Sequence, residues 1–370
     1  MKIYLVGGAV RDKLLGLPVK EKDWVVVGAS EDDMLKLGYQ RVGKEFPVFL
    51  HPKTRDEYAL ARMERKTSPG YKGFQFDASP KVTLEEDLIR RDLTINAMAE
   101  DETGKIIDPY HGKQDLEQKT LRHVSDAFQE DPVRILRVGR FLARYAALGF
   151  SVADETIALM KEMVRAGEVN ALVAERVWKE LERALSEPNP EKFFVVLEKC
   201  HALPILFPGL KVNGRGIDAL IAACNISPDS AVRLAALLHD YDSENNTITE
   251  LCSRYRIPNN HQKLVRLVAT HHETAAHAKS LTAEQLLDLF SRLDIFRREQ
   301  RFKHFLLACK AVATIKYTDN FDSEWLDNCA HAAKNVSIQK LIKEGFEGAA
   351  LAARIREERI KSIQQWLLSS

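Results

Sequence analysis

The sequence predicts an α+β protein, with a mixed α/β segment at the N-terminus and an all-helical remainder. The first third contains short apolar runs rich in β-branched and aromatic residues, and such runs bounded by glycine, proline or charge are typical of strands. After about residue 125 the apolar residues recur with helical spacing. At 370 residues, 45% hydrophobic and 29% charged, the chain is long enough to form two or three domains with real cores.

The mixed segment is expected to contain four strands and two short helices. We expect the strands at Ile3–Val6, Trp24–Val27, Val48–Leu50 and Tyr58–Ala61. Between them, Val10–Leu15 and Glu31–Leu37 predict helices, and Ser30 is the expected N-cap of the second. Residues 62–82 follow no period and predict a loop rich in basic and aromatic residues.

The remainder of the chain is predicted to be helical throughout. The clearest helical patterns are Pro132–Ala147, Asp154–Ala166, Glu175–Leu185, Ala231–His239, Ala283–Leu293 and Gly348–Leu368. No repeat of fixed period is present. We therefore divide the chain into a mixed segment at residues 1–125 and a helical remainder from residue 126 onwards.

Charge and cysteine usage limit the classes of function. With 54 Lys+Arg against 53 Asp+Glu, the net charge of +1 argues against a chain that coats nucleic acid through bulk positive charge, although local basic patches are compatible with it. The five cysteines are far apart and never form a Cys-x-x-Cys pair, which argues against a disulfide framework or a zinc knuckle. We expect no membrane span and no signal peptide, and hence a cytoplasmic protein.

A glycine turn near the N-terminus is the first candidate for a binding site. The strand expected at Ile3–Val6 ends in Gly7-Gly8 and passes directly into a helix. Glycines let the backbone approach a bulky ligand, and free N–H groups at a helix start favour phosphate. Arg11 adds a guanidinium suited to bidentate phosphate contact. Taken alone, a Gly-Gly turn is more often simply a turn.

A carboxylate pair follows ten residues later. Glu21 and Asp23 open the strand expected at Trp24–Val27, and residues at i and i+2 of a strand point to the same face. Beside a phosphate-binding turn, such a pair suits Mg²⁺, which prefers oxygen ligands and substrate phosphates. An isolated pair would more often be a solvated strand start, so its position after the glycine turn gives it weight.

Four arginines share one face of the helix expected at Pro132–Ala147. They are spaced three, three and four residues apart, and no acidic residue lies between residues 132 and 153. An anionic ligand would remove their mutual repulsion. We expect the opposite apolar face to pack on the N-terminal segment and so to bring the arginines near the glycine turn. The four arginines are Arg134, Arg137, Arg140 and Arg144.

Five motifs, in order, resemble those of the tRNA nucleotidyltransferase and poly(A) polymerase family of the polymerase-beta-like superfamily, in its gammaproteobacterial-type CCA-adding branch. They are Gly7–Asp12 with Glu21-x-Asp23, Asp87–Ala97, Asp108–Leu116, Glu130–Arg134 and Glu175–Trp178. The resemblance implies a nucleotidyltransferase head at residues 1–125, a helical RNA-binding neck at 126–212, and a helical body and tail at 213–370.

The resemblance also implies the chemistry. It is template-independent addition of C, C and A to the tRNA 3′ end from CTP and ATP, with release of pyrophosphate by two-metal transfer. Glu21 and Asp23 would be catalytic and hold Mg²⁺, although the usual family pattern is Asp-x-Asp and Glu21 is one methylene longer. Asp131 and Arg134 would read the base edge of the incoming nucleotide. The remaining nucleotide contacts would be Gly8, Arg11, Arg91, Arg137 and Arg140.

Several alternatives stay open at this point. A poly(A) polymerase is the nearest relative, and enzymes that add only CC or only A are narrower options; a full-length loop at residues 62–82 favours the complete reaction. His239-Asp240 resembles the HD phosphohydrolase signature, but the other expected ligands are missing, which indicates a shortened, degenerate region rather than a bifunctional enzyme. A non-catalytic RNA-binding scaffold is disfavoured by the intact Asp23. The oligomeric state and a role for Glu57 as a third carboxylate stay undetermined.

Overall fold

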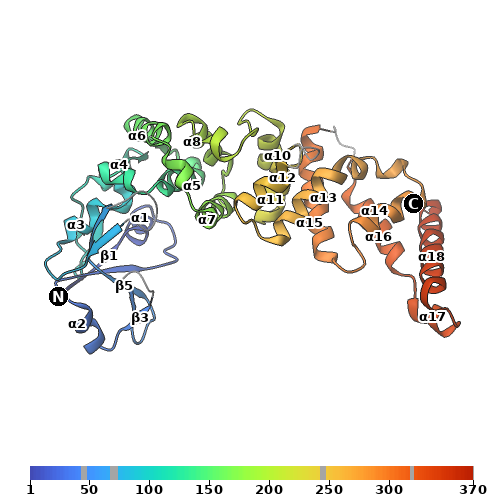
Figure 1. Ribbon diagram of the computed structural model, residues 1–370, viewed down its shortest axis with the longest axis horizontal. Helices are drawn as coiled ribbons and strands as arrows, with labels where there is room; N and C mark the ends of the chain where they lie inside the picture. The colour runs from blue at the N-terminus through green and yellow to red at the C-terminus, as the bar shows by residue number, and fades with distance from the viewer. Residues whose placement is uncertain (43–47, 67–73, 242–246, 317–320, 370) are drawn as a thin grey trace. The chain divides into compact units, whose positions relative to one another are not determined.

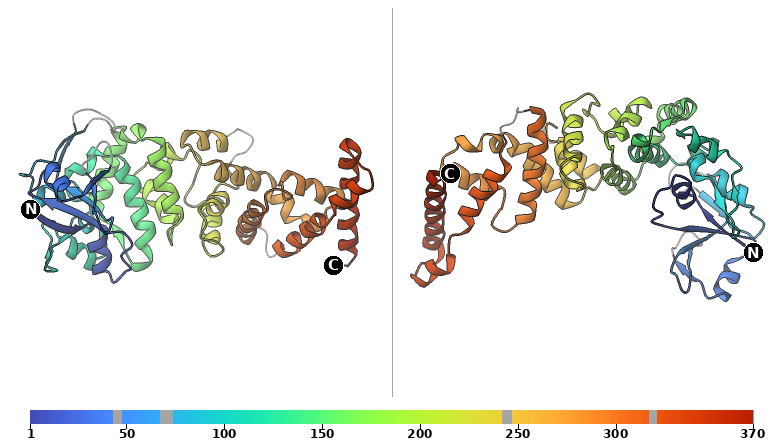
Figure 2. Two further views of the ribbon diagram at one scale, coloured as in Figure 1. Left: turned by 90° about the horizontal axis from the view of Figure 1, so that it is seen from below. Right: turned by 180° about the vertical axis from the view of Figure 1, so that it is seen from behind.

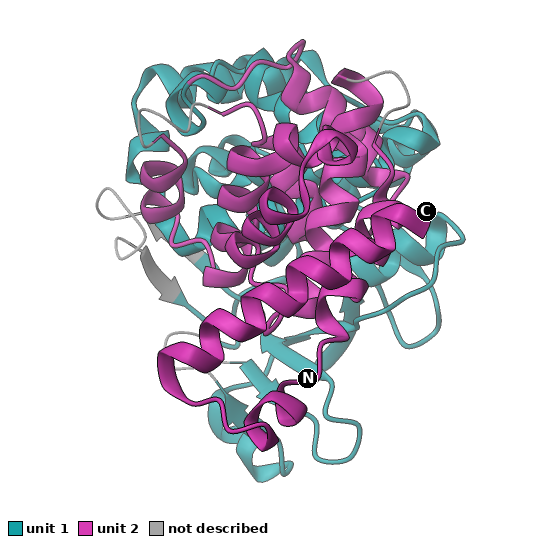
Figure 3. Cartoon of the chain, turned by 90° about the vertical axis from the view of Figure 1, so that its right-hand side faces the viewer, with its two compact units in different colours: residues 1–208 teal, residues 209–370 magenta. Residues whose placement is uncertain are grey.

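A computed structural model describes residues 1–42, 48–66, 74–241, 247–316 and 321–369. The chain divides into two compact units, Met1–Pro208 and Gly209–Ser370 (Figure 3). The first unit contains all the strands found in the described residues together with helices, and the second is helical (Figure 1). The α+β class predicted from the sequence is confirmed.

The strands of the first unit are short. They are β1 (Lys2–Val6), β2 (Asp23–Val27), β3 (Gln40–Val42), β4 (Val48–Leu50), β5 (Glu57–Leu60), β6 (Met63–Lys66), β7 (Phe74–Asp77), β8 (Ala99–Glu100), β9 (Ile106–Ile107), β10 (Thr120–Leu121) and β11 (Ser151–Val152). Within the described residues, seven of them form one mixed sheet in the order β3-β4-β5-β2-β1-β8-β9. β1 pairs antiparallel with β2, and β2 pairs parallel with β5.

In the first unit, some helices pack around this sheet and others continue the chain beyond it (Figure 2). They are α1 (Gly8–Leu14), α2 (Glu31–Lys36), α3 (Leu84–Ile89), η1 (Thr94–Asn96), α4 (Gly112–Glu117), η2 (Asp126–Glu130), α5 (Val133–Tyr145), η3 (Ala146–Leu148), α6 (Asp154–Arg165), η4 (Glu168–Ala171), α7 (Ala174–Leu185), α8 (Glu191–Lys199) and α9 (Leu203–Leu206). The helix label η marks 3₁₀ turns.

The two faces of the sheet bury different clusters. On β2, Val25 belongs to a cluster with Leu84 and Leu88 of α3, whereas Val26 belongs to a cluster with Met34 of α2. This alternation follows from the two-residue period of a strand. It places Asp23, two residues before Val25, on the face that α3 covers.

The second unit contains only helices among its described residues. They are α10 (Arg215–Cys224), α11 (Ser230–Leu237), α12 (Thr247–Arg254), α13 (Asn259–Ala276), η5 (Ala278–Ser280), α14 (Ala283–Arg292), α15 (Glu299–Lys316), α16 (Ser323–Lys334), α17 (Ile338–Lys343) and α18 (Gly348–Ser369). α10 and α11 pack on α15, and α18 packs on α14 and α16. No helix in the described part of the chain combines the length and apolarity needed to cross a membrane.

The predicted elements are observed within one or two residues, except for the loop expected at residues 62–82. Ser30 caps α2 through a capping box with Asp33, as its position before the helix predicts. The loop expected at residues 62–82 instead contains an antiparallel hairpin of β6 and β7, because strands with charged and aromatic residues lack the apolar alternation that marks a buried strand. The tip of this loop, residues 67–73, lies outside the described residues. β3 also has no clear apolar signal and was not expected.

Candidate active site

The glycine turn lies where β1 passes into α1. Gly7 is the N-cap of α1 and has a φ of 69°, which favours glycine. A Cβ at Gly7 would lie 2.8 Å from Nη1 of Arg91, so a side chain there would displace that guanidinium. Gly8 begins the helix, and a Cβ there would lie 3.3 Å from Nη2 of Arg11. The turn therefore holds two arginines close to its backbone.

The carboxylates lie beside this turn. Asp23 is the first residue of β2 and is in register with Val6, the residue before the glycines. On its other side it is in register with Glu57, the first residue of β5, so these two carboxylates point to the same face. Glu21 precedes the strand rather than opening it, so the expected strand geometry of the pair is wrong for Glu21.

Burial and neighbouring charges perturb the pKa of Asp23. Asp23 is exposed, although the surrounding protein atoms still remove part of the water around its carboxylate. Desolvation raises its pKa, the neighbouring Glu21 charge adds to the rise, and Arg91 opposes it. A divalent cation would relieve this repulsion, so the two carboxylates fit the Mg²⁺ predicted for them. In the described residues no group of three or more His, Cys, Asp or Glu side chains forms a closed metal site.

Arg91 is held between the turn and Asp23 by a buried carboxylate. Its Nη2 donates to Asp87 Oδ2 at 3.1 Å, and Arg90 Nη2 donates to Oδ1 of the same carboxylate at 2.8 Å. Burial disfavours ionisation of Asp87, but the two guanidinium groups outweigh it and lower its pKa. Arg91 is thus fixed with its guanidinium next to the glycine backbone, and its contact with a nucleotide stays a prediction.

Arg11 faces protein rather than solvent. It is 3% exposed, pairs with Asp12 and the side-chain oxygen of Asn96, and lies over the rings of Phe141 and Tyr145. In this conformation Arg11 links α1 to η1 and α5, and its guanidinium lies close to Gly8 of the glycine turn. Its direct contact with a nucleotide stays a prediction.

The arginine helix α5 is neutralised by acids from distant segments. Arg137 Nε donates to Asp92 Oδ2 at 2.7 Å, and Arg140 Nε donates to Glu180 Oε2 of α7 at 2.6 Å. Arg144 Nη2 donates to Asp12 Oδ2 at 3.0 Å. The expectation of an unpaired arginine stripe is therefore wrong, because a gap in acidic residues along the chain says nothing about acids that folding brings together.

The orientation of α5 also differs from expectation. Its bonds to residues 1–125 come from arginines, whereas we expected its apolar face to provide this contact. α5 packs on α7 and α8, and Gly139 allows this because a Cβ there would lie 3.0 Å from the Phe193 ring. The arginines nevertheless lie near the glycine turn, as predicted.

The predicted base-reading residues lie where η2 passes into α5. Arg134 is 8% exposed; its Nη1 donates to the Ala127 carbonyl at 2.9 Å and its Nη2 to the Arg90 carbonyl at 2.6 Å. Asp131 accepts two hydrogen bonds from Arg176 of α7. Arg134 thus ties the start of α5 to the segment that holds Arg91. Sequence reasoning assigned no role to Arg176, although its motif was recognised.

The motif at Asp108–Leu116 is structural. Asp108 accepts from the backbone N–H groups of Gly112 and Lys113 and so fixes the start of α4. Gly112 allows close packing, because a Cβ there would lie 2.4 Å from the Thr94 carbonyl oxygen. Asp115 accepts from the Thr94 hydroxyl at 2.6 Å. These contacts lock η1, which carries the Asn96 partner of Arg11.

The HD-like segment lies in the second unit, where His239 is buried and Asp240 is exposed. Nδ1 of His239 lies 2.8 Å from the Ala236 carbonyl and Nδ1 of His272 lies 2.9 Å from the Val268 carbonyl, so both Nδ1 atoms carry the proton. Their ring centroids are 5.3 Å apart. Asp240 pairs with Arg215 at 3.0 Å. Burial lowers the pKa of both histidines.

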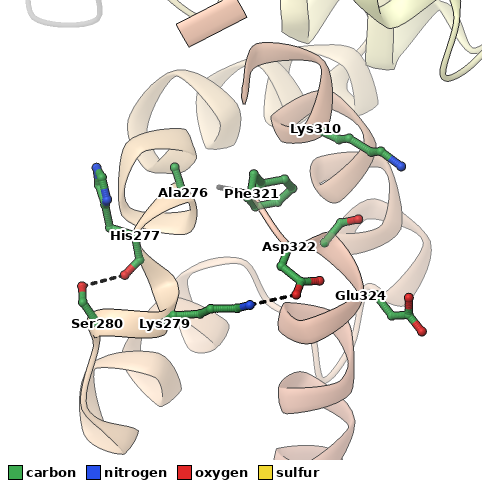
Figure 4. Close-up of a pocket in the computed structure, with 9 residues that line it drawn as sticks. Ala276, His277, Lys279, Ser280, Lys310, Phe321, Asp322 and Glu324 are labelled. Carbon is green, nitrogen blue, oxygen red and sulfur yellow. Dashed lines mark hydrogen bonds and ion pairs between the residues drawn. The ribbon is translucent and has the colours of Figure 1, made fainter. Parts of the chain in front are cut away.

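One open pocket of about 560 Å³ lies in the second unit (Figure 4). Lys279 and Asp322 form an ion pair of 2.9 Å across it, and Lys310 and Glu324 also line it. Its charges are balanced, and it contains none of the residues predicted to be catalytic or to bind nucleotide.

Comparison with known families accounts for much of the first unit. Residues 3–122 match the family model described as the poly A polymerase head domain. Residues 149–213 match the model described as a probable RNA and SrmB-binding site of polymerase A. The fold and the two family matches together place this chain among the nucleotidyltransferases with a poly(A) polymerase head.

Full-length relatives narrow the family further. The chain is 48% identical to the multifunctional CCA protein of Thioalkalivibrio sulfidiphilus, over 99% of this chain and 98% of the relative. It is 50% identical to the CCA-adding enzyme of Pseudomonas entomophila, over 99% of both. The chain belongs to the CCA-adding enzyme family.

Solved structures agree in fold. The Thermotoga maritima CCA-adding enzyme complexed with tRNA matches with a TM-score of 0.69 at 23% identity, over 100% of this chain and 91% of that one. A CCA-adding enzyme in complex with CTP matches with a TM-score of 0.71 at 24% identity, over 100% and 90% of the two chains.

Proposed function

We propose that this protein adds C, C and A to the 3′ end of tRNA, using CTP and ATP and releasing pyrophosphate at each step. The observation that carries the proposal is the meeting of three groups on one face of the head sheet. The Gly7-Gly8 turn offers backbone N–H groups, Arg91 lies against that turn, and Asp23 is in register with the strand that ends there. These are the groups that nucleotidyl transfer needs: a phosphate cradle, a cation and a carboxylate.

Glu21 and Asp23 hold Mg²⁺ in this proposal, and the bound ion would activate the tRNA 3′-hydroxyl and neutralise the leaving pyrophosphate. The chain's own groups do the rest. The Gly7-Gly8 backbone and Arg91 orient the triphosphate so that its α-phosphate faces the hydroxyl. Arg137 and Arg140, which Asp92 and Glu180 hold in place, donate their remaining N–H groups to the triphosphate and ribose in this proposal.

Asp131 and Arg134 select the base. An ionised carboxylate only accepts hydrogen bonds, so it suits the exocyclic amine that cytosine and adenine share. Uracil and guanine present a carbonyl in place of the amine and a ring N–H in place of the ring acceptor, so Asp131 would face an acceptor, Arg134 would face a donor, and neither would gain a hydrogen bond from the base. Selection thus needs no nucleic-acid template. A cytoplasmic location follows from the tRNA substrate.

Incubation of the purified protein with tRNA that lacks its 3′ CCA tests the proposal. We expect uptake of two C residues followed by one A, dependent on Mg²⁺. Long A tracts would instead indicate a poly(A) polymerase, termination after CC would indicate the narrower enzyme, and no incorporation would indicate an RNA-binding scaffold.

A further inference from the structure

Arg176 forms a bidentate pair with the carboxylate of Asp131 through both terminal nitrogens of its guanidinium. Nη1 donates to Oδ1 at 3.0 Å and Nη2 donates to Oδ2 at 2.7 Å. The two residues are 45 positions apart in the chain and meet because α5, which follows Asp131, packs on α7. Such parallel bonds fix the plane of a carboxylate as well as its position.

A third donor completes the environment of this carboxylate. The backbone N–H of Val133 donates to Asp131 Oδ1 at 3.1 Å. An ionised carboxylate has about four acceptor sites, and these three donors from the described residues occupy two on Oδ1 and one on Oδ2. One acceptor site on Oδ2 is therefore left for a ligand, and its direction is set by Arg176.

We propose that Arg176 is a positioning residue that determines nucleotide specificity by restricting Asp131 to a single outward acceptor site. The proposal rests on the proposed function, in which Asp131 reads the base. A carboxylate turns readily about its terminal torsion. Without the grip of Arg176, Asp131 could rotate to accept from the ring N–H of uracil or guanine, which lies elsewhere on the base edge. With Arg176 in place, only a base whose amine lies opposite Oδ2 of Asp131 forms the hydrogen bond.

The planar fork of arginine is needed for this role, since lysine offers a charge without parallel donors. Arg176→Lys therefore separates geometry from charge, and Arg176→Gln removes the charge. Arg183→Gln is the matched control, because Arg183 is on the same helix and exposed.

The experiment measures kcat and KM for CTP and for UTP on tRNA lacking its CCA end, with circular dichroism to check folding. We expect Arg176→Gln to lower the CTP-to-UTP ratio of kcat/KM about 10-fold to 100-fold, the range for losing one well-aligned base contact. Arg176→Lys should lose much of the same selectivity while its folding is unchanged. Asp131→Ala should lose selectivity, and the double variant Asp131→Ala with Arg176→Gln should lose no more than Asp131→Ala alone, because Arg176 acts through Asp131.

Three results would overturn the proposal in distinguishable ways. If Asp131→Ala loses selectivity while both Arg176 variants keep it, the base-reading role of Asp131 stands and the role of Arg176 is wrong. If the double variant loses the sum of both effects, Arg176 acts independently of Asp131. If Asp131→Ala keeps full selectivity, base reading by Asp131 is wrong, and the role of Arg176 falls with it.

Discussion

Asp92 links the head to the arginine helix, and its replacement by asparagine provides a quantitative test of that link. The carboxylate is 6% exposed and accepts from Leu93 N and Asn96 Nδ2 at 2.9 Å each and from Arg137 Nε at 2.7 Å. Burial opposes its ionisation, but Arg137 and Asn96 outweigh this and hold its pKa well below the ordinary range.

Asparagine keeps the size of Asp92 but removes the charge. Oδ1 of Asp92 serves Leu93 and Asn96 while Oδ2 serves Arg137, so an amide nitrogen at either place opposes a donor. Breaking a buried ion pair costs about 3–5 kcal/mol, and the Arg137 side chain is 34% exposed, so water recovers part of this. We expect a loss of about 2–3 kcal/mol, which for a unit of this size lowers Tm by about 4–12 °C.

Thermal unfolding of the full chain at pH 7, followed by circular dichroism, measures this loss. Asp32→Asn is the control, since Asp32 is exposed in the first turn of α2 and its charge contributes only about 0.5 kcal/mol to the free energy of unfolding. Because the pKa of Asp92 is lowered by folding, its stabilisation is complete above the unfolded value of about 3.9 and disappears as the pH falls below it. The difference from wild type should therefore shrink below about pH 4. A Tm for Asp92→Asn within about 2 °C of the control at pH 7 would refute the reasoning.

Two further predictions concern the glycine turn and the buried histidines. Gly7→Ala should lower the free energy of unfolding by about 1–2 kcal/mol because of the positive φ at Gly7, and should slow CMP incorporation at least about tenfold because the new Cβ displaces Arg91. Gly38→Ala is the control, because Gly38 has a φ of 84° and open space around it and so carries the same backbone cost. Equal activity of the two variants would contradict the role assigned to the glycine turn. The folded-state pKa of His239 and His272 is lowered by burial, so stability should be full above the unfolded pKa of about 6.5 and should fall as the pH drops below it. Unfolding midpoints from pH 7.5 to 5.5 measure this, and replacing both histidines with glutamine should flatten the slope; an unchanged slope would assign the pH dependence to other groups.

Most elements and the glycine turn could be predicted from the sequence because both depend on local patterns. Ser30 before α2 and the apolar runs of β1 and β2 are local signals of this kind. The hairpin of β6 and β7 was missed because its residues carry no apolar alternation.

Partners across long sequence separations could not be predicted in the same way. Glu180 lies 40 residues after Arg140, and Asp92 lies 45 residues before Arg137, so neither neutralising acid shows in the spacing of the arginines. The grip of Arg176 on Asp131 has the same origin. The motif containing Arg176 was visible in the sequence, but its target depends on how α7 packs on α5.

Single-turnover incorporation of labelled CMP tests the central claim most directly, with wild type compared with Asp23→Asn and with Asp32→Asn as the control. Removing one metal-binding carboxylate at the reacting phosphate removes several kcal/mol of transition-state stabilisation. We therefore expect Asp23→Asn to lower the rate by about 1,000-fold or more while its affinity for tRNA stays within about threefold of wild type. A rate for Asp23→Asn equal to that of the control would contradict the assignment of the catalytic centre to this face of the head sheet.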